Sequence, residues 1–297
     1  MNAVTIMLIL LGVVAAIFAF FFIKDVVAHK DEPAEGTNGG KSPLWISAVI
    51  GLITNFFDTL GIGSFAPTTA SFKATKVVDD SVIPGTLNVA HTLPVVFMAF
   101  MYIRSVEVDI VTLITLIAAA TIGAWLGAGV VAKFDKKTIQ LVMGVALLIT
   151  AIVMTLRTTG VIAGFGTGTD YGLSGGLLIA GIIAHLILGA LMTAGVGLYA
   201  PSMAVIYLLG LSPLVAFPIM MGACAFLMPV GSVKFIKEGK YARKQSLAIA
   251  IPGILGVFLA IRLVLNLPMQ AITWLVIGVI VITSITMLIS YSKTKKA

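Results

Sequence analysis

The chain has 297 residues, of which 59% are hydrophobic and only 10% are charged. A soluble domain carries about 25% charged residues, so this composition excludes a soluble globular protein. The single cysteine, Cys224, excludes a disulfide framework and a paired-cysteine centre. We expect Cys224 to be a small residue of the protein interior.

Eight long apolar runs follow one another along the chain. Each is about 20 residues long, the length that a helix needs to cross the ~30 Å hydrocarbon core of a bilayer. The runs are continuous rather than alternating, which excludes the strands of a membrane barrel. The sequence therefore predicts an all-α polytopic membrane protein. The expected spans lie near 3–23, 82–103, 109–132, 137–157, 173–194, 213–233, 245–262 and 269–290.

The net charge of +7 comes mainly from lysines and arginines in short loops between the apolar runs. These loops lie near 24–41, 73–76, 133–137, 234–244 and 293–296. Short loops rich in Lys and Arg favour the cytoplasmic side of a membrane. The charge therefore indicates topology rather than a nucleic-acid partner. It predicts an N-terminus outside and a C-terminus inside the cytoplasmic membrane of a prokaryote.

The N-terminal run lacks a preceding basic region and a small-residue cleavage site. We therefore expect a retained transmembrane anchor rather than a cleaved signal peptide. The polar stretch that follows contains Pro and Gly and predicts a cytoplasmic linker. The expected segments are an anchor (1–23), a linker (24–43), a first repeat (44–157), a connecting loop (158–175), a second repeat (176–290) and a cytoplasmic tail (291–297).

A twelve-residue motif occurs twice, 134 positions apart. The first copy reads TLGIGSFAPTTA from residue 59, and the second reads TAGVGLYAPSMA from residue 193. The duplication extends beyond the motif. Further matches at an offset of 133 or 134 are Pro84 with Pro218, Gly123 with Gly256, Gly144 with Gly278 and Met154 with Met287.

Each repeat reads as a span, a glycine break, a short apolar segment and three full spans. The short segments, 64–73 and 198–211, would be roughly 15–21 Å long as helices, too short to cross a bilayer alone. Each short segment forms either a re-entrant hairpin with the preceding helix or half of a broken span. Each repeat then crosses the membrane an odd number of times, which predicts that the two repeats are inverted. Inverted repeats with interrupted helices are typical of secondary transporters.

The repeated motif predicts an anion-binding site. Glycines let the backbone leave helical geometry, and proline suits the first turn of a new helix. Two half-helix N-termini with nearby hydroxyls would then direct N–H groups and positive dipole ends at a central cavity. The alternative is a pair of tightly packed glycine kinks without a ligand. The expected substrate-binding residues are Thr59, Gly61, Gly63, Ser64, Pro67, Thr68, Thr193, Gly195, Gly197, Tyr199, Pro201 and Ser202.

Few ionisable side chains fall within the spans, and we consider three of them, with two asparagines, as candidates for ion coupling. They are Asn55, Asp58, Asn88, His91 and His185. A carboxylate at membrane depth is costly and is a functional candidate by default, although Asp58 could also be a structural acceptor. The histidines could bind an anion or relay a proton, or be satisfied interior residues. No His, Cys, Asp and Glu set has metal-ligand spacing, so no metal or other cofactor is expected.

The two halves resemble the sulfite exporter TauE/SafE family of membrane permeases. The resemblance rests on LGIGSFAP and AGVGLYAP, together with TIGAWLGAGVV (121–131) and KFIKEGKYARK (234–244), and it covers about 44–290. Family members tend to carry more glycines where this chain has Ser64 and Leu198. The resemblance implies substrates that are small sulfur-bearing anions, such as sulfite, sulfonates, sulfoacetate or thiosulfate.

The sequence thus predicts a secondary active transporter for a small, sulfur-containing anion, coupled to H⁺ or Na⁺ and working by alternating access. An anion channel is the first alternative, because re-entrant half-helices also build pores. An intramembrane enzyme is the second, but the polar residues show no recognisable catalytic spacing. The sequence leaves the direction of transport and the oligomeric state open.

Overall fold

A computed structural model describes residues 3–34, 36–130, 136–161, 169–193 and 197–294 of the chain. These residues form helices and no β-strand. Eight helices are long and apolar enough to cross a membrane, which confirms the expected number of long spans. They are α1 (Ala3–Ala28), α4 (Ile83–Ser105), α5 (Ile110–Val130), α6 (Lys136–Thr158), α7 (Gly175–Thr193), α9 (Ala216–Lys237), α10 (Arg243–Leu265) and α11 (Met269–Thr294).

The described residues also form three shorter α-helices: α2 (Leu44–Thr59), α3 (Phe65–Thr75) and α8 (Tyr199–Leu208). Short 3₁₀ turns, η1 (Thr37–Gly39), η2 (Asp80–Val82) and η4 (Pro213–Val215), connect the longer elements. Helices α3 and α8 lie where the two short segments were expected. The first repeat opens with α2, which has 16 residues and belongs to the glycine-broken helix pair expected there. Helix α2 begins after Pro43 and ends at the glycine break. Its length is therefore about 24 Å.

The chain forms two compact units, and each takes helices from both predicted repeats. Unit 1 contains residues 1–104 and 224–265, and unit 2 contains residues 105–223 and 266–297. The division falls inside α9, after Ala223. A compact unit is therefore not the same stretch of chain as a sequence repeat. The inversion of the repeats stays a prediction.

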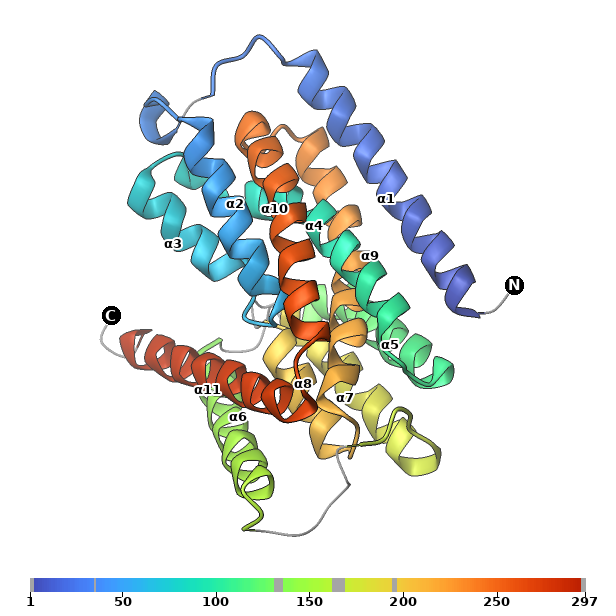
Figure 1. Cartoon of the computed structure of the whole chain (residues 1–297). Helices are drawn as coiled ribbons and strands as arrows, with labels where there is room; N and C mark the ends of the chain where they lie inside the picture. Colours follow the sequence, from blue (N-terminus) through green and yellow to red (C-terminus); the bar gives the residue numbers. More distant parts are fainter. Residues whose placement is uncertain (1–2, 35, 131–135, 162–168, 194–196, 295–297) are drawn as a thin grey trace. The chain divides into compact units, whose positions relative to one another are not determined.

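In unit 1, α2 packs along α10 at very short range (Figure 1). A Cβ atom at Gly51 would collide with the backbone of Ile249. A Cβ atom at Gly256 would collide with the backbone of Leu52. Small residues at a helix contact let two backbones approach closely in membrane proteins. Glycines of both helices thus set this pairing.

In unit 2, α5 and α7 pack in the same way. A Cβ atom at Gly123 would collide with the backbone of Leu186, and one at Gly189 with the backbone of Ala120. Leu52 and Leu186 are 134 positions apart, and Gly123 and Gly256 are 133 apart. The same glycine-to-leucine contact therefore occurs once in each unit, at the offset of the duplicated motif.

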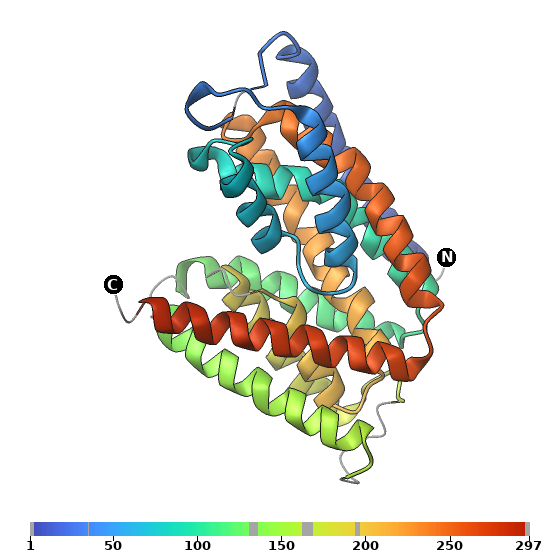
Figure 2. The ribbon, with the colours of Figure 1, turned by 60° about the vertical axis from the view of Figure 1, so that its left-hand side comes forward.

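Helices α6 and α11 form the other close pair of unit 2, and Figure 2 shows them running side by side. The Ser284 hydroxyl donates to the Gly144 carbonyl at 2.7 Å. A Cβ atom at Gly144 would press on the side chain of Leu288. The absence of a side chain at position 144 therefore lets α11 lie against α6.

The N-terminal helix α1 docks on unit 1 through aromatic residues. Phe18 and Phe22 are buried in a cluster with Val89, Ile236 and Tyr241. The rings of Phe18 and Phe22 stack with centroids 5.6 Å apart. Tyr241 lies in the short connection between α9 and α10, so this cluster attaches α1 near the start of α10.

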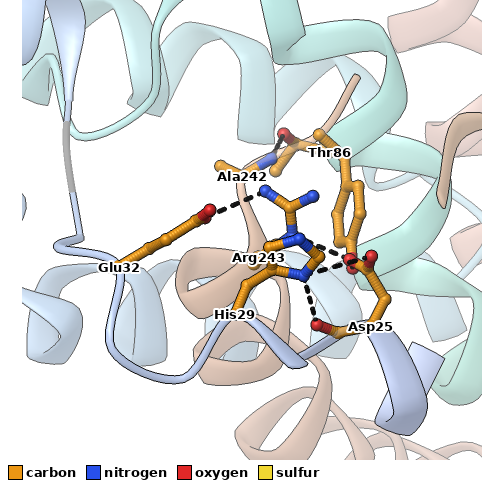
Figure 3. A network of polar contacts seen from close by, with 7 residues as sticks. Asp25, His29, Glu32, Thr86, Ala242 and Arg243 are labelled. Carbon is orange, nitrogen blue, oxygen red and sulfur yellow. Dashed lines mark hydrogen bonds and ion pairs between the residues drawn. The ribbon is translucent and has the colours of Figure 1, made fainter. Parts of the chain in front are cut away.

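A polar network extends this attachment (Figure 3). The Arg243 guanidinium donates to the Asp25 carboxylate at 2.7 Å and to Glu32 at 3.0 Å. The Tyr241 hydroxyl donates to the same Asp25 oxygen at 2.6 Å. Burial and the hydrogen bond to Asp25 raise the pKa of the Tyr241 hydroxyl above its usual range, so this hydroxyl remains a donor. Arg243 thus joins α1 and the following linker to α10.

Candidate functional site

The first glycine break, between α2 and α3, depends on two glycines in left-handed conformation. Gly61 has φ +93° and Gly63 has φ +89°. Any L side chain is strained in this region of the backbone map. Helix α3 begins at Phe65, and Pro67 lies in its first turn, where the missing N–H costs no helical hydrogen bond. The predicted break is therefore confirmed at this position, with a conformational reason for each glycine.

The carboxylate of Asp58 lies at the N-terminus of α3. Ser64 is the N-cap residue of α3, and its hydroxyl donates to Asp58 Oδ2 at 3.1 Å. Both side chains are buried, with exposures of 1% for Asp58 and 3% for Ser64. A negative charge is favoured at a helix N-terminus. The protein's own carboxylate thus takes the position that the sequence assigns to a substrate anion.

His91 of α4 joins α2 to α3. Its Nδ1 atom lies 2.9 Å from Asn55 Oδ1, and its Nε2 atom lies 3.1 Å from the Thr68 hydroxyl. The Asn55 amide nitrogen donates to the Gly51 carbonyl at 2.7 Å. His91, Asn55 and Thr68 are fully buried. Three predicted candidates from three different helices therefore form one hydrogen-bonded chain.

Other buried polar groups of unit 1 lie near the chain of hydrogen bonds formed by Asn55, His91 and Thr68. The Thr59 hydroxyl donates to the Asn55 carbonyl at 2.7 Å, so it serves its own helix. The Tyr102 hydroxyl donates to the Thr59 carbonyl at 3.0 Å and secures the last residue of α2. Tyr102 was not among the site residues expected from the sequence. Tyr102 lies eleven residues after His91 on α4, which is about three helical turns. This spacing places both residues on the same face of the helix and could have identified Tyr102.

A second pair that sequence reasoning missed connects α4 with α9. The Thr92 and Ser232 hydroxyls lie 2.8 Å apart and both are fully buried. The two residues are 140 positions apart, so neither periodicity nor the repeat offset indicates their contact. Asn88 does not join these groups through its amide nitrogen, which donates to the Pro84 carbonyl of its own helix at 2.9 Å.

The second break, between α7 and α8, is described only in part. Gly195 lies outside the described residues, as does the side chain of Thr193. Gly197 has no left-handed φ, and a Cβ atom there would meet nothing within 4 Å. Gly197 therefore differs from its counterpart Gly63, because its conformation does not require glycine. Beyond it, α8 begins at Tyr199, which is half-buried.

Helix α8 places Pro201 and Ser202 as α3 places Pro67 and Thr68. The Ser202 hydroxyl lies 3.0 Å from His185 Nε2, and His185 Nδ1 lies 3.0 Å from the Gly181 carbonyl. Ser202 and His185 are fully buried. In each break, the hydroxyl at the fourth residue of the half-helix therefore contacts Nε2 of a buried histidine. His91 belongs to α4 and His185 to α7, so the sequence repeat does not predict this similarity.

The arrangement offers hydroxyls, backbone N–H groups and neutral donors or acceptors. Within the described part of the chain, no group of three or more His, Cys, Asp or Glu side chains could hold a metal ion. Cys224 is buried, as expected. Hydroxyl, backbone N–H and imidazole groups are of the kind that can bind an anion or a proton.

A cavity of about 300 Å³ lies elsewhere in unit 1, beside the Arg243 network. Residues of the linker, of the connection before α10 and of the start of α10 line it, Glu32, Tyr241 and Lys244 among them. The buried hydroxyls of Thr68 and Ser202 do not line this cavity. Both hydroxyls belong to fully buried residues.

Comparisons with known proteins identify the family. The family model described as Sulfite exporter TauE/SafE matches residues 2–175. This match includes the N-terminal helix, which the resemblance in the sequence had left outside, and it ends where the second repeat begins. No curated protein and no solved structure matches the chain. Because the family model covers more than half of the chain and eight helices can cross a membrane, the protein belongs to the TauE/SafE family of membrane transporters and is not an enzyme.

Proposed function

We propose that the protein is a secondary active transporter for a small sulfur-containing anion of the sulfite, sulfonate, sulfoacetate or thiosulfate class. Family membership supports transport of a sulfur-bearing anion. The proposed transport is coupled to H⁺ or Na⁺ and works by alternating access of two inverted repeats. Those repeats share short helices that follow glycine breaks, an arrangement typical of secondary transporters.

One observation carries this proposal: each break leads into a short helix whose fourth residue holds a fully buried hydroxyl. The N–H groups at the start of such a helix have no helical partner. Together with the dipole they favour an anion. Thr68 and Ser202 would add hydrogen bonds of about 1.5–3 kcal/mol each to a charged acceptor.

Asp58 gives the proposed coupling a physical basis. Its carboxylate occupies the N-terminus of α3, so a substrate anion at that helix end meets a like charge. Neutralisation of Asp58 by H⁺ or Na⁺ removes this repulsion and favours the anion. The repeat counterpart of Asp58 is Met192, so the N-terminus of α8 has no such carboxylate at the matching position.

The proposal is tested by counterflow in proteoliposomes loaded with unlabelled anion. The external probes are radiolabelled sulfite, thiosulfate and methanesulfonate, with acetate as the anion without sulfur. A carrier concentrates external label while unlabelled substrate leaves, whereas a channel does not. We expect counterflow of at least one sulfur-containing anion and none of acetate. A conductance without counterflow would establish the channel alternative and contradict the proposal.

A further inference from the structure

The two buried histidines have a fixed hydrogen-bond direction, which follows from their neighbours. The Gly51 carbonyl can only accept, so the atom of Asn55 that faces it is the NH₂ group. The other amide atom of Asn55, the oxygen, therefore faces His91 Nδ1 at 2.9 Å. An oxygen acceptor there requires that His91 carry its hydrogen on Nδ1.

The direction at the opposite ring nitrogen follows. In a neutral imidazole only one nitrogen carries hydrogen, so Nε2 of neutral His91 presents a lone pair. The Thr68 hydroxyl, 3.1 Å away, must then donate its single hydrogen to Nε2. The lone pairs of the Thr68 oxygen remain for any other neighbour. In this state Thr68 is an acceptor and not a donor toward a ligand.

Unit 2 repeats this arrangement with different partners. The Gly181 carbonyl can only accept, so His185 carries its hydrogen on Nδ1 as well. Nε2 of neutral His185 then accepts from the Ser202 hydroxyl at 3.0 Å. The sequence repeat predicts that the Thr68 and Ser202 hydroxyls bind the anion. Each of them therefore already donates its single hydrogen to a histidine.

We propose that His91 and His185 control whether Thr68 and Ser202 can bind an anion, and that the anion enters together with a proton on Nε2. This inference rests on the proposed transport of an anion and names the proton as its coupling ion. A protonated imidazole donates from both nitrogens. It then donates to the hydroxyl oxygen, which frees the hydroxyl hydrogen for the anion. Without that proton, an anion would meet lone pairs, or the hydroxyl would turn and leave Nε2 without a donor.

The charged neighbours of each histidine are few. Around His91, α2 carries Asp58, α3 carries Lys73, and α4 itself carries Arg104. Of these three, only Asp58 is buried; Lys73 and Arg104 are exposed. On α9 and α10, Lys234, Lys237 and Arg262 are exposed, whereas Arg243 and Lys244 are half-buried at the start of α10.

Around His185 the surroundings carry even less charge. Helices α5 and α7 contain no Asp, Glu, Lys or Arg. Helix α8 contributes Tyr199 and Tyr207, and the Arg157 guanidinium lies over the Tyr207 ring at 5.1 Å. A proton on His185 together with an anion on Ser202 forms a neutral pair in this apolar interior. The pair is favoured over either charge alone.

The hydrogen positions can be measured directly, because the chain contains only three histidines. In ¹⁵N-histidine-labelled protein in nanodiscs, ring nitrogen chemical shifts separate protonated from unprotonated nitrogens. His91→Gln and His185→Gln variants assign the signals. We expect Nδ1 protonated and Nε2 unprotonated for both residues in anion-free protein near neutral pH. A hydrogen on Nε2 in anion-free protein would overturn the inference whether or not the protein transports anions.

Methanesulfonate is a suitable anion probe, because it remains deprotonated at all working pH values. Calorimetric titration in two buffers with different protonation enthalpies measures proton uptake on binding. We expect that binding takes up a proton. The affinity for methanesulfonate should then fall by about tenfold per pH unit for each proton taken up, at pH values where the histidine of the anion-free protein is neutral. His91→Gln, which keeps a hydrogen-bonding side chain but cannot titrate, should reduce this uptake. His29→Gln, at the third histidine of the chain and outside both breaks, is the matched control and should retain it.

Binding of methanesulfonate without proton uptake would contradict the inference and leave anion transport intact. If methanesulfonate, sulfite and thiosulfate all fail to bind, the proposed function is wrong. In that case the ring nitrogen signals still decide whether Nε2 of each histidine accepts the hydrogen of its neighbouring hydroxyl.

Discussion

At the scale of single residues, the two breaks differ in what they demand of their glycines. Gly61 and Gly63 have left-handed backbone conformations that other residues adopt only at a cost. Gly197 has an ordinary φ and open space around its Cα atom. Sequence identity between Gly63 and Gly197 therefore does not imply the same physical role.

This difference predicts that alanine destabilises the protein at position 63 but has little effect at position 197. Gly63→Ala should lower the free energy of unfolding by about 1–2 kcal/mol, because an L residue at this φ is strained. Gly197→Ala is the matched control and should stay within about 0.5 kcal/mol of the parent protein. Denaturant unfolding in detergent micelles, followed by tryptophan fluorescence, measures both. Equal losses in the two variants would contradict the conformational argument.

Asp58 should matter for coupling rather than for folding. In Asp58→Asn, the amide can still accept from Ser64 but carries no charge to neutralise. We expect the variant to lose uphill accumulation of substrate while retaining exchange. Proteoliposome transport with and without an ion gradient measures the two activities. An Asn variant with normal uphill transport would assign Asp58 a structural role.

Part of the residue-scale site could be predicted from the sequence. Asn55 and Thr59 are one turn apart on α2, as expected, but the Thr59 hydroxyl donates to the backbone carbonyl of Asn55 rather than to its side chain. The contact of Thr68 with His91 spans 23 residues and depends on how α3 folds back on α4. Tertiary contacts of this kind have no local sequence pattern, so the role of His91 could be suspected but its partners could not be predicted.

At the scale of helices, glycine contacts define the pairs α2–α10 and α5–α7. Alanine stabilises an exposed helix position relative to glycine by about 0.5–1 kcal/mol. At Gly256 and Gly123 a Cβ atom would instead collide with backbone atoms of Leu52 and Leu186. A Gly→Ala substitution should therefore lower stability where two helix backbones touch and raise it where they do not.

We expect Gly256→Ala and Gly123→Ala each to lower stability by about 1–3 kcal/mol, the range typical of overpacking. Gly278→Ala is the control, since a Cβ atom there would meet nothing within 4 Å. It should raise stability or leave it unchanged. Thermal unfolding in detergent measures all three. Stabilisation by Gly256→Ala or Gly123→Ala would show that its helix pair is more widely spaced.

The attachment of α1 provides another test at this scale. Arg243→Gln removes the charge-assisted hydrogen bonds to Asp25 and Glu32 and should cost about 1–3 kcal/mol. Lys240→Gln removes only the exposed ion pair with Glu238 and should cost less than about 1 kcal/mol. Limited trypsin digestion should cleave the linker faster in Arg243→Gln. Equal digestion of both variants and the parent would contradict the role of Arg243.

The helices themselves were the most predictable feature. Long apolar runs give the eight spans directly, because hydrocarbon thickness sets their length. The pairing of α2 with α10 could not be predicted in the same way. The glycine matches at offsets of 133 and 134 were visible, but only the structure shows that Gly256 touches the helix that carries Leu52.

At the scale of the whole molecule, the predicted topology is open to a direct test. Tyr171 and Lys240 are exposed and lie in the loops before α7 and before α10. With Cys224 replaced by Ala, Tyr171→Cys should react with a membrane-impermeant maleimide from outside. Lys240→Cys should react only after the membrane is opened. Labelling of both from the same side would rule out the inverted repeats that we propose.

Uphill transport tests the central claim most directly. Proteoliposomes are given an imposed proton gradient or sodium gradient, and accumulation of radiolabelled sulfite or thiosulfate is followed over time. We predict accumulation above the external concentration under one of the two gradients and its collapse when an ionophore dissipates that gradient. Substrate that only equilibrates, with the same rate under every gradient, would contradict an ion-coupled transporter.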